Sequence, residues 1–365
     1  MNIQMVDMSR QYQEVKNKIE PKVIQILESG QYINGPEVKG FEEKAATYTG
    51  VRHAIGCANG TDALQIAMMS LGIGPGDEVI TTPFTFIATA ETIKIIGAVP
   101  VFVDIDPETY NIDPEKIEAA ITAKTKAVIP VHLYGQAADM DRINKIAKDR
   151  CIRVIEDNAQ GLGAKYKGKM LGSLSDIATV SFYPAKNLGA AGDAGLMLTD
   201  NDKLAETARM TANHGQNERY KHSIIGINSR LDAIQAAILN IKMEKLDEWN
   251  EKRRYAADRY KNNLKDTVII PFEHPENHHI YHQYSIQVKR RDDLQKYLAE
   301  YNIPSAIHYP IPLHLQKAFE GLKLEKGSFP VSEKISEGII SLPMHPHLKN
   351  EEIDFVSDKI KDFYN

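Results

Sequence analysis

Cysteine and surplus charge are both scarce in this 365-residue chain. The two cysteines, Cys57 and Cys151, stand far apart, and neither belongs to a CxxC pair. This count excludes a disulfide framework and a thiolate metal site, and it predicts a protein of a reducing compartment. Lysine and arginine number 44 against 49 aspartates and glutamates, a formal net charge of −5 without a basic run. Binding of nucleic acid or another polyanion is therefore excluded as the main activity.

Long hydrophobic runs are also missing. The longest apolar stretch, residues 95–103, is too short to span a bilayer and is interrupted by Gly97 and Pro100. The N-terminal segment contains Asp7 and Arg10 and has no apolar core of the kind found in signal peptides. We therefore expect a cytoplasmic protein without a membrane partner.

Histidine pairs are present, but not in a metal-binding pattern. His278 and His279 are adjacent, and a single proline separates His345 from His347. Neither pair has the i, i+4 spacing or the neighbouring carboxylate cluster of known zinc sites. We predict that the protein binds no metal.

Short β-branched runs alternate with helical patterns between residues 79 and 198. Strands are predicted at residues 78–81, 99–103, 127–131 and 152–155, with helices at 86–96, from 114 and from 140. This alternation is typical of a mostly parallel sheet with helices on both faces. From residue 231 to about residue 260 the apolar spacing predicts one long helix. We predict a large α/β domain over residues 1–245 and a smaller α+β domain over residues 246–365.

A glycine-rich segment, residues 72–76, has the look of a dinucleotide-binding loop. That loop must follow a strand and open a helix, whereas this segment follows a predicted helix and precedes the strand at residue 79. We interpret it as a helix-ending turn. The main argument for nicotinamide binding is thereby removed.

A second glycine-containing segment, Asn59-Gly60-Thr61-Asp62, lies between an apolar run and a strongly helix-forming one. Gly60 and Thr61 then occupy the first turn of a helix. There, free backbone N–H groups and the helix dipole favour a phosphate, and the Thr61 hydroxyl is a further donor. The other interpretation is ordinary N-capping by Thr61 or Asp62. The segment alone does not choose between the two.

Two carboxylates, Glu156 and Asp157, stand at the carboxyl end of the strand predicted at residues 152–155. Ligands of open α/β sheets bind at that edge. An aspartate there can pair with a cationic ring nitrogen and keep it protonated, because opposite charges favour each other's charged forms. A solvated strand end or a helix cap explains the two residues equally well.

Residues 181–195 contain a single lysine, Lys186, in a loop rich in glycine and alanine. A lysine with few polar neighbours loses its charge more easily, and the free amine is the form that makes Schiff bases. A lone loop lysine is usually just solvated. Here it follows a candidate phosphate cradle and a strand-end aspartate, so the chain has the three fixtures that pyridoxal phosphate needs.

Five segments together resemble the pyridoxal-phosphate-dependent nucleotide-sugar aminotransferases of the DegT/StrS type, and the resemblance covers nearly the whole chain. The segments are residues 58–64, 156–160, 181–195, 228–232 and 308–310. The resemblance implies the fold of the aspartate aminotransferases (type I). This fold has a three-layer α/β/α large domain, with a mostly parallel sheet, and a smaller C-terminal α+β domain. It also implies a homodimer with shared active sites and L-glutamate as the amino donor.

The resemblance further implies three chemical roles. Lys186 forms the Schiff base with the cofactor and later moves the proton between substrate and cofactor carbons. Asp157 pairs with the pyridinium nitrogen, and Gln160 contacts the ring hydroxyl. Some relatives have histidine in place of this lysine and dehydrate their substrate. The presence of Lys186 is evidence against that branch and against a lyase.

By the same resemblance, five residues hold the cofactor in place. Gly60, Thr61 and Ser181 match the phosphate-binding positions, and Asn228 reaches the phosphate from the neighbouring subunit. Phe86 matches the aromatic residue that stacks on the cofactor ring, although a core aromatic is the other interpretation. The chain departs from the common family pattern at Asn158 and Ala194, neither of which removes a group that the chemistry needs.

The substrate is inferred from finer likenesses. Residues 182–189, 212–216 and 341–346 look most like the enzymes that aminate UDP-2-acetamido-2-deoxy-3-oxo-glucuronate for surface polysaccharides. Arg230, His308 and Tyr309 are the predicted substrate contacts. Arg230, His308 or Arg219 would supply a cation for the uronate carboxylate, and for Arg219 a solvated loop charge is the favoured interpretation. The rival substrate is a dTDP-3-oxo-6-deoxyhexose. A rival of another class is a non-catalytic sensor that binds the cofactor or a nucleotide sugar.

Overall fold

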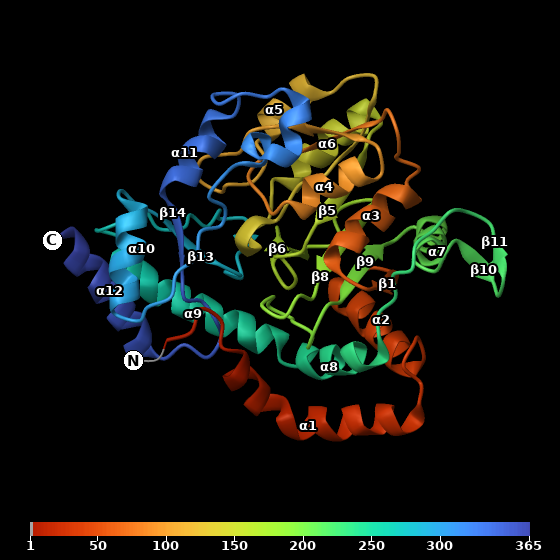
Figure 1. Cartoon of the computed structure of the whole chain (residues 1–365), viewed down its shortest axis with the longest axis horizontal. Coiled ribbons are helices and arrows are strands. Elements are labelled where there is room, and N and C mark those ends of the chain that lie inside the picture. The colour runs from red at the N-terminus through yellow and green to blue at the C-terminus, as the bar shows by residue number, and fades with distance from the viewer. Residues whose placement is uncertain (1–2) are drawn as a thin grey trace.

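The computed structural model describes residues 3–365 (Figure 1). Its helices are α1 (Met8–Ser29), α2 (Pro36–Thr49), α3 (Gly60–Ser70), α4 (Ala88–Ile95), α5 (Pro114–Ala120), α6 (Met140–Arg150), α7 (Asp202–Thr211), α8 (Ala233–Met243), α9 (Leu246–Leu264), α10 (Arg291–Glu300), α11 (Pro330–Gly338) and α12 (Asn350–Tyr364). Within residues 3–365, no helix is long and apolar enough to cross a membrane.

The strands fall into one large sheet and three small ones. The large sheet contains β1 (His53–Cys57), β2 (Glu78–Thr81), β3 (Val99–Phe102), β4 (Thr125–Val128), β5 (Arg153–Asp157), β8 (Ile177–Ser181) and β9 (Gly195–Thr199). The small ones contain β6 (Lys165–Tyr166), β7 (Lys169–Met170), β10 (Gln216–Glu218), β11 (Lys221–His222), β12 (Asn277–His278), β13 (Tyr284–Gln287) and β14 (Ile339–Leu342).

The large sheet has the strand order β1-β9-β8-β5-β4-β2-β3. The five strands from β8 to β3 run parallel, and β9 is antiparallel to both of its neighbours. The predicted strands and helices between residues 78 and 157 are confirmed, with bounds that differ by a few residues. The parallel arrangement places the carboxyl ends of β5 and β8 at one edge, where ligands bind in such sheets.

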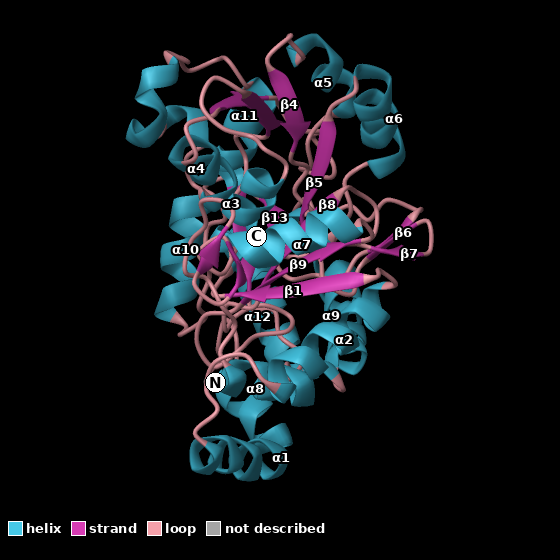
Figure 2. Ribbon diagram, turned by 90° about the vertical axis from the view of Figure 1, so that its right-hand side faces the viewer, coloured by secondary structure: helices cyan, strands magenta, loops and turns pink. Residues whose placement is uncertain are grey.

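Helices cover both faces of the sheet, as Figure 2 shows from the side. One hydrophobic cluster joins the sheet to α3, α4 and α7, and includes Ile66, Ile93 and Ala208. On the other face, α2 and α8 pack over β8 and β9, while α5 and α6 pack over β2, β4 and β5. Successive side chains of a strand point to opposite faces of the sheet, so the buried side chains of each strand are divided between the clusters on the two faces. The predicted three-layer α/β/α architecture is confirmed.

The long helix predicted from residue 231 to about residue 260 is wrong, because α8 ends at Met243 and α9 starts at Leu246. The backbone tightens between them: the Lys245 N–H donates to the carbonyl of Lys242, three residues back, at 2.9 Å. This change of direction lets Leu246 join the cluster of α2 and α8 while Trp249 packs against α1. Tertiary packing overrides the continuous apolar spacing of the sequence.

The glycine-rich segment after α3 is the helix-ending turn that was predicted. Leu71 is the C-cap of α3, and Gly72 follows with a φ of 74° in the left-handed region. The chain then enters β2, which lies between β4 and the edge strand β3.

A separate hydrophobic cluster lies around α9, α10, α12 and the β13–β14 pair, and its members come from Ile3 and from residues 256–360. The N-terminal segment is fastened to this cluster: the Met344 N–H donates to the Met5 carbonyl at 3.2 Å. The guanidinium of Arg10 also pairs with Glu352 at 2.8 Å. The division at residue 245 stays a prediction, since α9 also contacts α1 through Trp249.

Candidate active site

The first turn of α3 has two free backbone donors. Asn59 is its N-cap, since the Asn59 side chain accepts from the Asp62 N–H at 2.8 Å and its carbonyl accepts from the Ala63 N–H at 3.1 Å. The alternative of capping by Thr61 or Asp62 is therefore wrong. The N–H groups of Gly60 and Thr61 have no partner within residues 3–365. An anion suits such a helix terminus, because unpaired donors and the helix dipole coincide there.

Ser181 closes the cradle from the opposite side. It is the last residue of β8, and a Cβ atom placed on Gly60 would come within 2.6 Å of its Cβ and 3.1 Å of its Cα. Only glycine lets the helix terminus approach the strand end this closely. The three predicted phosphate contacts, Gly60, Thr61 and Ser181, are thus brought together in one place.

Replacing Gly60 with alanine is expected to weaken cofactor binding about tenfold, equivalent to about 1.4 kcal/mol. The added methyl group pushes α3 away from the backbone of Ser181 and misaligns the two free N–H groups. The matched control is Gly74→Ala, where an added Cβ meets nothing within 4 Å. Fluorescence or absorbance titration of apo-protein with pyridoxal phosphate measures both affinities. Equal affinities in the two variants would show that the first turn of α3 does not bind the cofactor phosphate.

Asp157 ends β5 at the carboxyl edge of the sheet, and its side chain is only 5% exposed. Its Oδ2 accepts from the Thr89 hydroxyl at 2.7 Å, and its Oδ1 accepts from the Ala159 N–H at 3.2 Å. Both oxygens therefore accept hydrogen bonds. Among the residues that the structure describes, this buried carboxylate forms no salt bridge, so it is suited to pair with a cationic group brought by a ligand.

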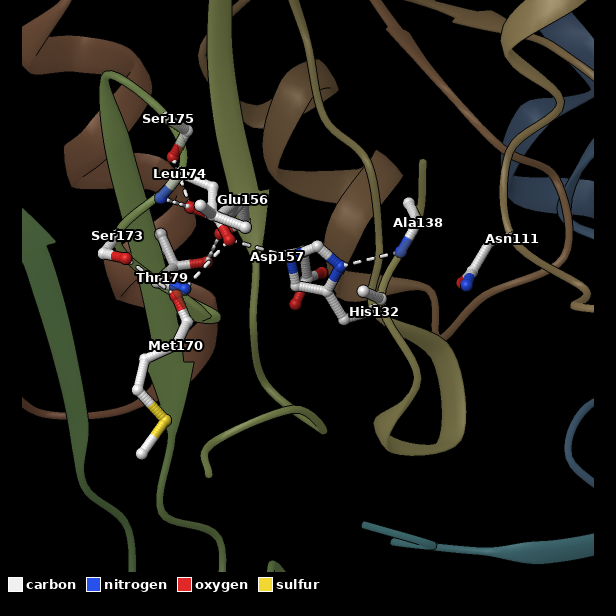
Figure 3. A network of polar contacts seen from close by, with 12 residues as sticks. Asn111, His132, Ala138, Glu156, Asp157, Met170, Ser173, Leu174, Ser175 and Thr179 are labelled. Carbon is white, nitrogen blue, oxygen red and sulfur yellow. Dashed lines mark hydrogen bonds and ion pairs between the residues drawn. The ribbon is translucent and has the colours of Figure 1, made fainter. Parts of the chain in front are cut away.

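Glu156, the neighbouring carboxylate, belongs to a different network (Figure 3). It is fully buried and accepts from His132 at 2.9 Å, from the N–H groups of Gly172 and Leu174 at 2.9 and 2.8 Å, and from Ser175 at 2.8 Å. Burial alone would raise its pKa, but the hydrogen bonds from His132 and the backbone outweigh burial and lower it. Glu156 fixes the strand end, which leaves Asp157 as the carboxylate that faces the site.

The hydrogen bonds of the His132 ring show which of its two nitrogens carries the hydrogen. Its Nδ1 accepts from the Ala138 N–H at 3.2 Å, so Nε2 carries the hydrogen and donates it to Glu156. Also, the His132 backbone N–H donates to the carbonyl of Asp157 at 3.1 Å. His132 thus connects the Glu156 carboxylate and the Asp157 backbone to the loop that follows β4.

Lys186 lies in the loop between β8 and β9, where burial lowers the pKa of its amine to about 8 despite the opposing charge of Asp157. Burial disfavours the ammonium form, so a far larger fraction of this amine is uncharged at neutral pH than for an exposed lysine. Within residues 3–365 its Nζ has no hydrogen-bond partner, although Asp157 acts on it electrostatically. The amine is free to react.

Lys242 shows that a lowered pKa does not by itself identify a reactive lysine. Burial lowers the pKa of Lys242, too, to about 8. Its Nζ, however, donates to the carbonyl of Gly189 at 2.7 Å and to Gln11 at 3.0 Å. Lys242 therefore braces the end of the Lys186 loop, whereas the Lys186 amine is left unpartnered.

Aromatic side chains form the remaining wall. Phe86 is 54% exposed, which is unusual for a large aromatic and contradicts the interpretation of Phe86 as a core residue. The centroid of its ring lies 6.2 Å from that of Tyr309. The Tyr309 hydroxyl accepts from the Gln160 side chain at 3.2 Å, while the Gln160 Oε1 accepts from the Tyr134 N–H at 2.7 Å. A flat ligand ring can therefore stack on the exposed Phe86 ring, beside the Gln160 amide, whose two hydrogen bonds fix its orientation.

These features fit pyridoxal phosphate: an anion cradle, a carboxylate, an unpartnered amine and an exposed aromatic face. The comparison with known proteins agrees, because the sequence profile of the DegT/DnrJ/EryC1/StrS aminotransferase family matches residues 13–361. The chain belongs to this family. It is a sugar aminotransferase that works with pyridoxal phosphate.

Relatives of this aminotransferase match it over nearly their whole length. A "Pleiotropic regulatory protein" from Geobacillus stearothermophilus is 50% identical over 100% of this chain and 99% of its own. The UDP-2-acetamido-2-deoxy-3-oxo-D-glucuronate aminotransferase of Pseudomonas aeruginosa is 48% identical, covering 97% and 98%. The dTDP-3-amino-3,6-dideoxy-α-D-galactopyranose transaminase of Aneurinibacillus thermoaerophilus is 45% identical, covering 98% of each chain.

Among solved structures, S. venezuelae DesV in complex with a ketimine intermediate superimposes with a TM-score of 0.98. It is 38% identical, and the match covers 100% of this chain and 99% of DesV. The aspartate-aminotransferase-like fold inferred from the sequence is therefore confirmed.

The aminotransferase places the predicted substrate residues at two locations. His308 lies next to Tyr309, one of the aromatic residues that line the site. Its Nδ1 is 2.8 Å from the Ser341 hydroxyl, and its carbonyl accepts from the Tyr134 hydroxyl. Arg230 instead donates to Asn213 at 3.1 Å and lines a cavity of about 860 Å³ between α2, β1 and α7. Asn228 is exposed on the same short segment. In a single chain these contacts do not join Arg230 to the Lys186 cluster.

Several residues that surround the reactive groups were missed from the sequence. Thr89, His132 and the three-residue chain of His282, Asn187 and Asn250 carry no motif of their own. His282 contacts Asn187 at 3.0 Å, and Asn187 contacts Asn250 at 2.7 Å, over separations of 95 and 63 residues. A polar residue directly after the lysine, at position 187, was the one available sign that the loop is held from behind.

Asn158, one of the two departures from the family pattern, is completely buried. Its side-chain amide has no hydrogen-bond partner within residues 3–365, and the Cβ that Gly161 lacks would lie 2.3 Å from its Oδ1. Ala194 is buried in the cluster of α2 and α8. Neither side chain forms a hydrogen bond to Lys186 or Asp157.

Proposed function

We propose that this aminotransferase moves the amino group of L-glutamate to the C3 keto carbon of UDP-2-acetamido-2-deoxy-3-oxo-glucuronate. The product would serve surface polysaccharide synthesis in the cytoplasm. The observation that carries the proposal is the convergence of Lys186, Asp157 and the free donors of α3 in one site. The substrate is supported by the likeness to the Pseudomonas aeruginosa enzyme. The location is supported by the free thiols of Cys57 and Cys151.

When bound, pyridoxal phosphate supplies a ring that accepts the electron pair released at the substrate carbon. The side chains of the protein supply the remaining functions. Asp157 holds the ring nitrogen cationic, which strengthens that electron withdrawal. The Lys186 amine, of which about a tenth is uncharged at pH 7 when its pKa is about 8, removes the α-proton of glutamate and returns a proton in the second half of the reaction. Phe86 and Tyr309 shield the ring from water.

The cation for the uronate carboxylate is Arg230 rather than His308. Burial and the charge of Lys186 lower the pKa of His308 to about 4, so its ring is neutral at physiological pH. Arg230 remains charged, and its buried Nε has no hydrogen-bond partner within residues 3–365. A guanidinium with unused donors is the natural partner of a carboxylate.

A homodimer would bring Arg230 to the cofactor of the neighbouring copy. The segment that precedes Asn228 and Arg230 includes the β10–β11 hairpin, which projects from the body of the molecule in Figure 1. Two large hydrophobic side chains on this segment, Tyr220 and Ile225, are 78% and 87% exposed. Apolar groups on a projecting arm are typical of a surface that another subunit covers.

The decisive experiment follows the visible spectrum of cofactor-loaded protein while UDP-2-acetamido-3-amino-glucuronate is added. Conversion of the band of lysine-bound cofactor into the pyridoxamine band supports the uronate substrate. The alternative is a dTDP-3-oxo-6-deoxyhexose, supported by the relative from Aneurinibacillus thermoaerophilus. A band that moves only with the dTDP-3-amino-6-deoxyhexose overturns the uronate, while a missing band overturns the cofactor chemistry itself and favours a sensor.

Replacing Arg230 with methionine is expected to raise KM for the uronate substrate about 10- to 100-fold, with little change in kcat, because charge-assisted hydrogen bonds to the carboxylate are lost. Steady-state kinetics measures both constants. Arg150→Met is the control, since the exposed guanidinium of Arg150 pairs with Glu118 of α5 and does not line the Arg230 cavity. An unchanged KM in Arg230→Met would show that this arginine does not bind the carboxylate.

Sharing of the site is tested by mixing two inactive or impaired variants, Lys186→Ala and Arg230→Met, after joint unfolding and refolding. If the lysine and the arginine of one site come from different subunits, mixed dimers contain one intact site. About a quarter of the wild-type activity then returns at low substrate concentration. If both residues act within one chain, mixing restores nothing.

A further inference from the structure

Behind Lys186 lies a chain of three buried polar side chains, His282, Asn187 and Asn250. His282 is 6% exposed, Asn187 is 5% exposed and Asn250 is 2% exposed. Asn187 directly follows the reactive lysine in sequence, whereas His282 precedes β13 and Asn250 lies in α9. The chain therefore links the Lys186 loop to two elements that are distant in sequence.

The hydrogen bonds fix the direction of each amide. Asn250 donates its Nδ2 to the carbonyl of Leu162 at 3.4 Å, which leaves its Oδ1 as an acceptor. Asn187 donates its Nδ2 to that Oδ1 at 2.7 Å, so the Oδ1 of Asn187 must accept as well. The His282 Nδ1 lies 3.0 Å from this oxygen and must carry a hydrogen. His282 is thus a donor through Nδ1–H, and its Nε2 is a lone pair.

The backbone of His282 is held just as firmly. Its N–H donates to the carbonyl of Tyr134 at 2.7 Å, in the turn whose N–H contacts Gln160. On the opposite side, its carbonyl accepts from the buried guanidinium of Arg253 at 3.5 Å. Burial and the positive charges of Lys186 and Arg253 lower the pKa of His282 well below its ordinary value, so its ring stays neutral.

We propose that His282 is a positioning residue for the amination reaction, which fixes Asn187, and through it the Lys186 amine, by the single Nδ1–H hydrogen bond. A neutral ring with this tautomer does so without adding a second positive charge beside the amine. The role requires a donor at the Nδ1 position and nothing at Nε2.

Asparagine and glutamine separate these two positions. The amide nitrogen of an asparagine at 282 occupies about the place of Nδ1, and that of a glutamine occupies about the place of Nε2. His282→Asn is therefore expected to stay within about threefold of wild-type kcat, since the donor is retained. His282→Gln is expected to lose about tenfold in kcat, the worth of one hydrogen bond, with KM little changed.

A readout that does not depend on turnover uses the apo-protein. Lys186 is labelled with formaldehyde and cyanoborohydride between pH 6 and 10, and the modified peptide is quantified by mass spectrometry. In the wild type and in His282→Asn, labelling should be half-maximal near pH 8, the pKa of the buried amine. In His282→Gln the released loop exposes the amine to water, so the midpoint moves upward toward that of an ordinary lysine.

The two variants decide the proposal together. Equal behaviour of His282→Asn and His282→Gln, in kcat and in the labelling midpoint, would overturn it. If His282→Gln does not fold, Asn187→Ala supplies the same test by removing the acceptor. Its labelling midpoint must rise, and an unchanged midpoint overturns the proposal equally. Where both variants fold, the double variant should be no worse than Asn187→Ala alone, because Asn187→Ala already removes the hydrogen bond that His282→Gln breaks.

Discussion

Lys186→Ala is expected to lose more than about 10⁴-fold in turnover, since the nucleophile and the proton carrier disappear together. The unpartnered amine, with a pKa lowered to about 8 by burial, is the group that both tasks need. The visible band of lysine-bound cofactor should vanish as well, while the unfolding temperature of the apo-protein stays close to wild type. Absorbance spectra, glutamate-dependent turnover and thermal melts measure these three quantities.

The control for this variant is Lys242→Met. Lys242 is the other lysine whose pKa burial lowers to about 8, but its amine is occupied by Gly189 and Gln11. We expect Lys242→Met to keep the visible band and to unfold at a lower temperature, because Gly189 loses its buried donor. A normal band in Lys186→Ala, or a lost band in a folded Lys242→Met, would contradict the assignment of the reactive lysine.

Asp157→Asn is expected to lower kcat about 10²- to 10³-fold, the effect of removing one charged group that stabilises the transition state. Without the carboxylate, the ring nitrogen is no longer held cationic. The amide can keep both contacts, with its oxygen accepting from the Ala159 N–H and its NH₂ group donating to the Thr89 hydroxyl, which can in turn donate to Thr85, so the variant mainly removes the charge. Single-turnover kinetics with glutamate isolates the affected half-reaction.

Thr89→Val separates charge from geometry at this position. The variant removes the 2.7 Å hydrogen bond to Asp157 but keeps the carboxylate and nearly the same side-chain shape. We expect a loss of about 10- to 100-fold, smaller than that of Asp157→Asn, because a hydrogen bond to a charged group is worth about 1.5–3 kcal/mol. If Thr89→Val were as damaging as Asp157→Asn, the orientation of Asp157 would outweigh its charge in the reaction.

The groups proposed to carry the chemistry stand out in the sequence because their local patterns are distinctive. A lone lysine in a loop of glycine and alanine, a carboxylate at a strand end and a glycine at a helix start each narrow the chemistry. The same patterns could not choose among similar neighbours. Asparagine, threonine and aspartate all cap helices, so the role of Asn59 became clear only from its two hydrogen bonds.

Features that depend on contacts distant in sequence could not be predicted. The break between α8 and α9 falls within a continuous apolar pattern, and it exists because Trp249 packs against α1 while Leu246 joins the sheet side. The separation of Glu156 from Asp157 likewise depends on His132, which comes 24 residues earlier. His282 stands 95 residues from Asn187, and nothing in the intervening sequence indicates that they meet.

The fastening of the N-terminal segment to the last part of the chain matters for synthesis on the ribosome. The seven strands of the cofactor-binding sheet are all present once residue 199 has been made, so this sheet can form early. Ile3, however, belongs to a cluster whose other members extend to residue 360. Domains generally fold during translation from the N-terminus onward. Here Ile3 and Met5 can take their places only after the segment that reaches Ile360 has been made.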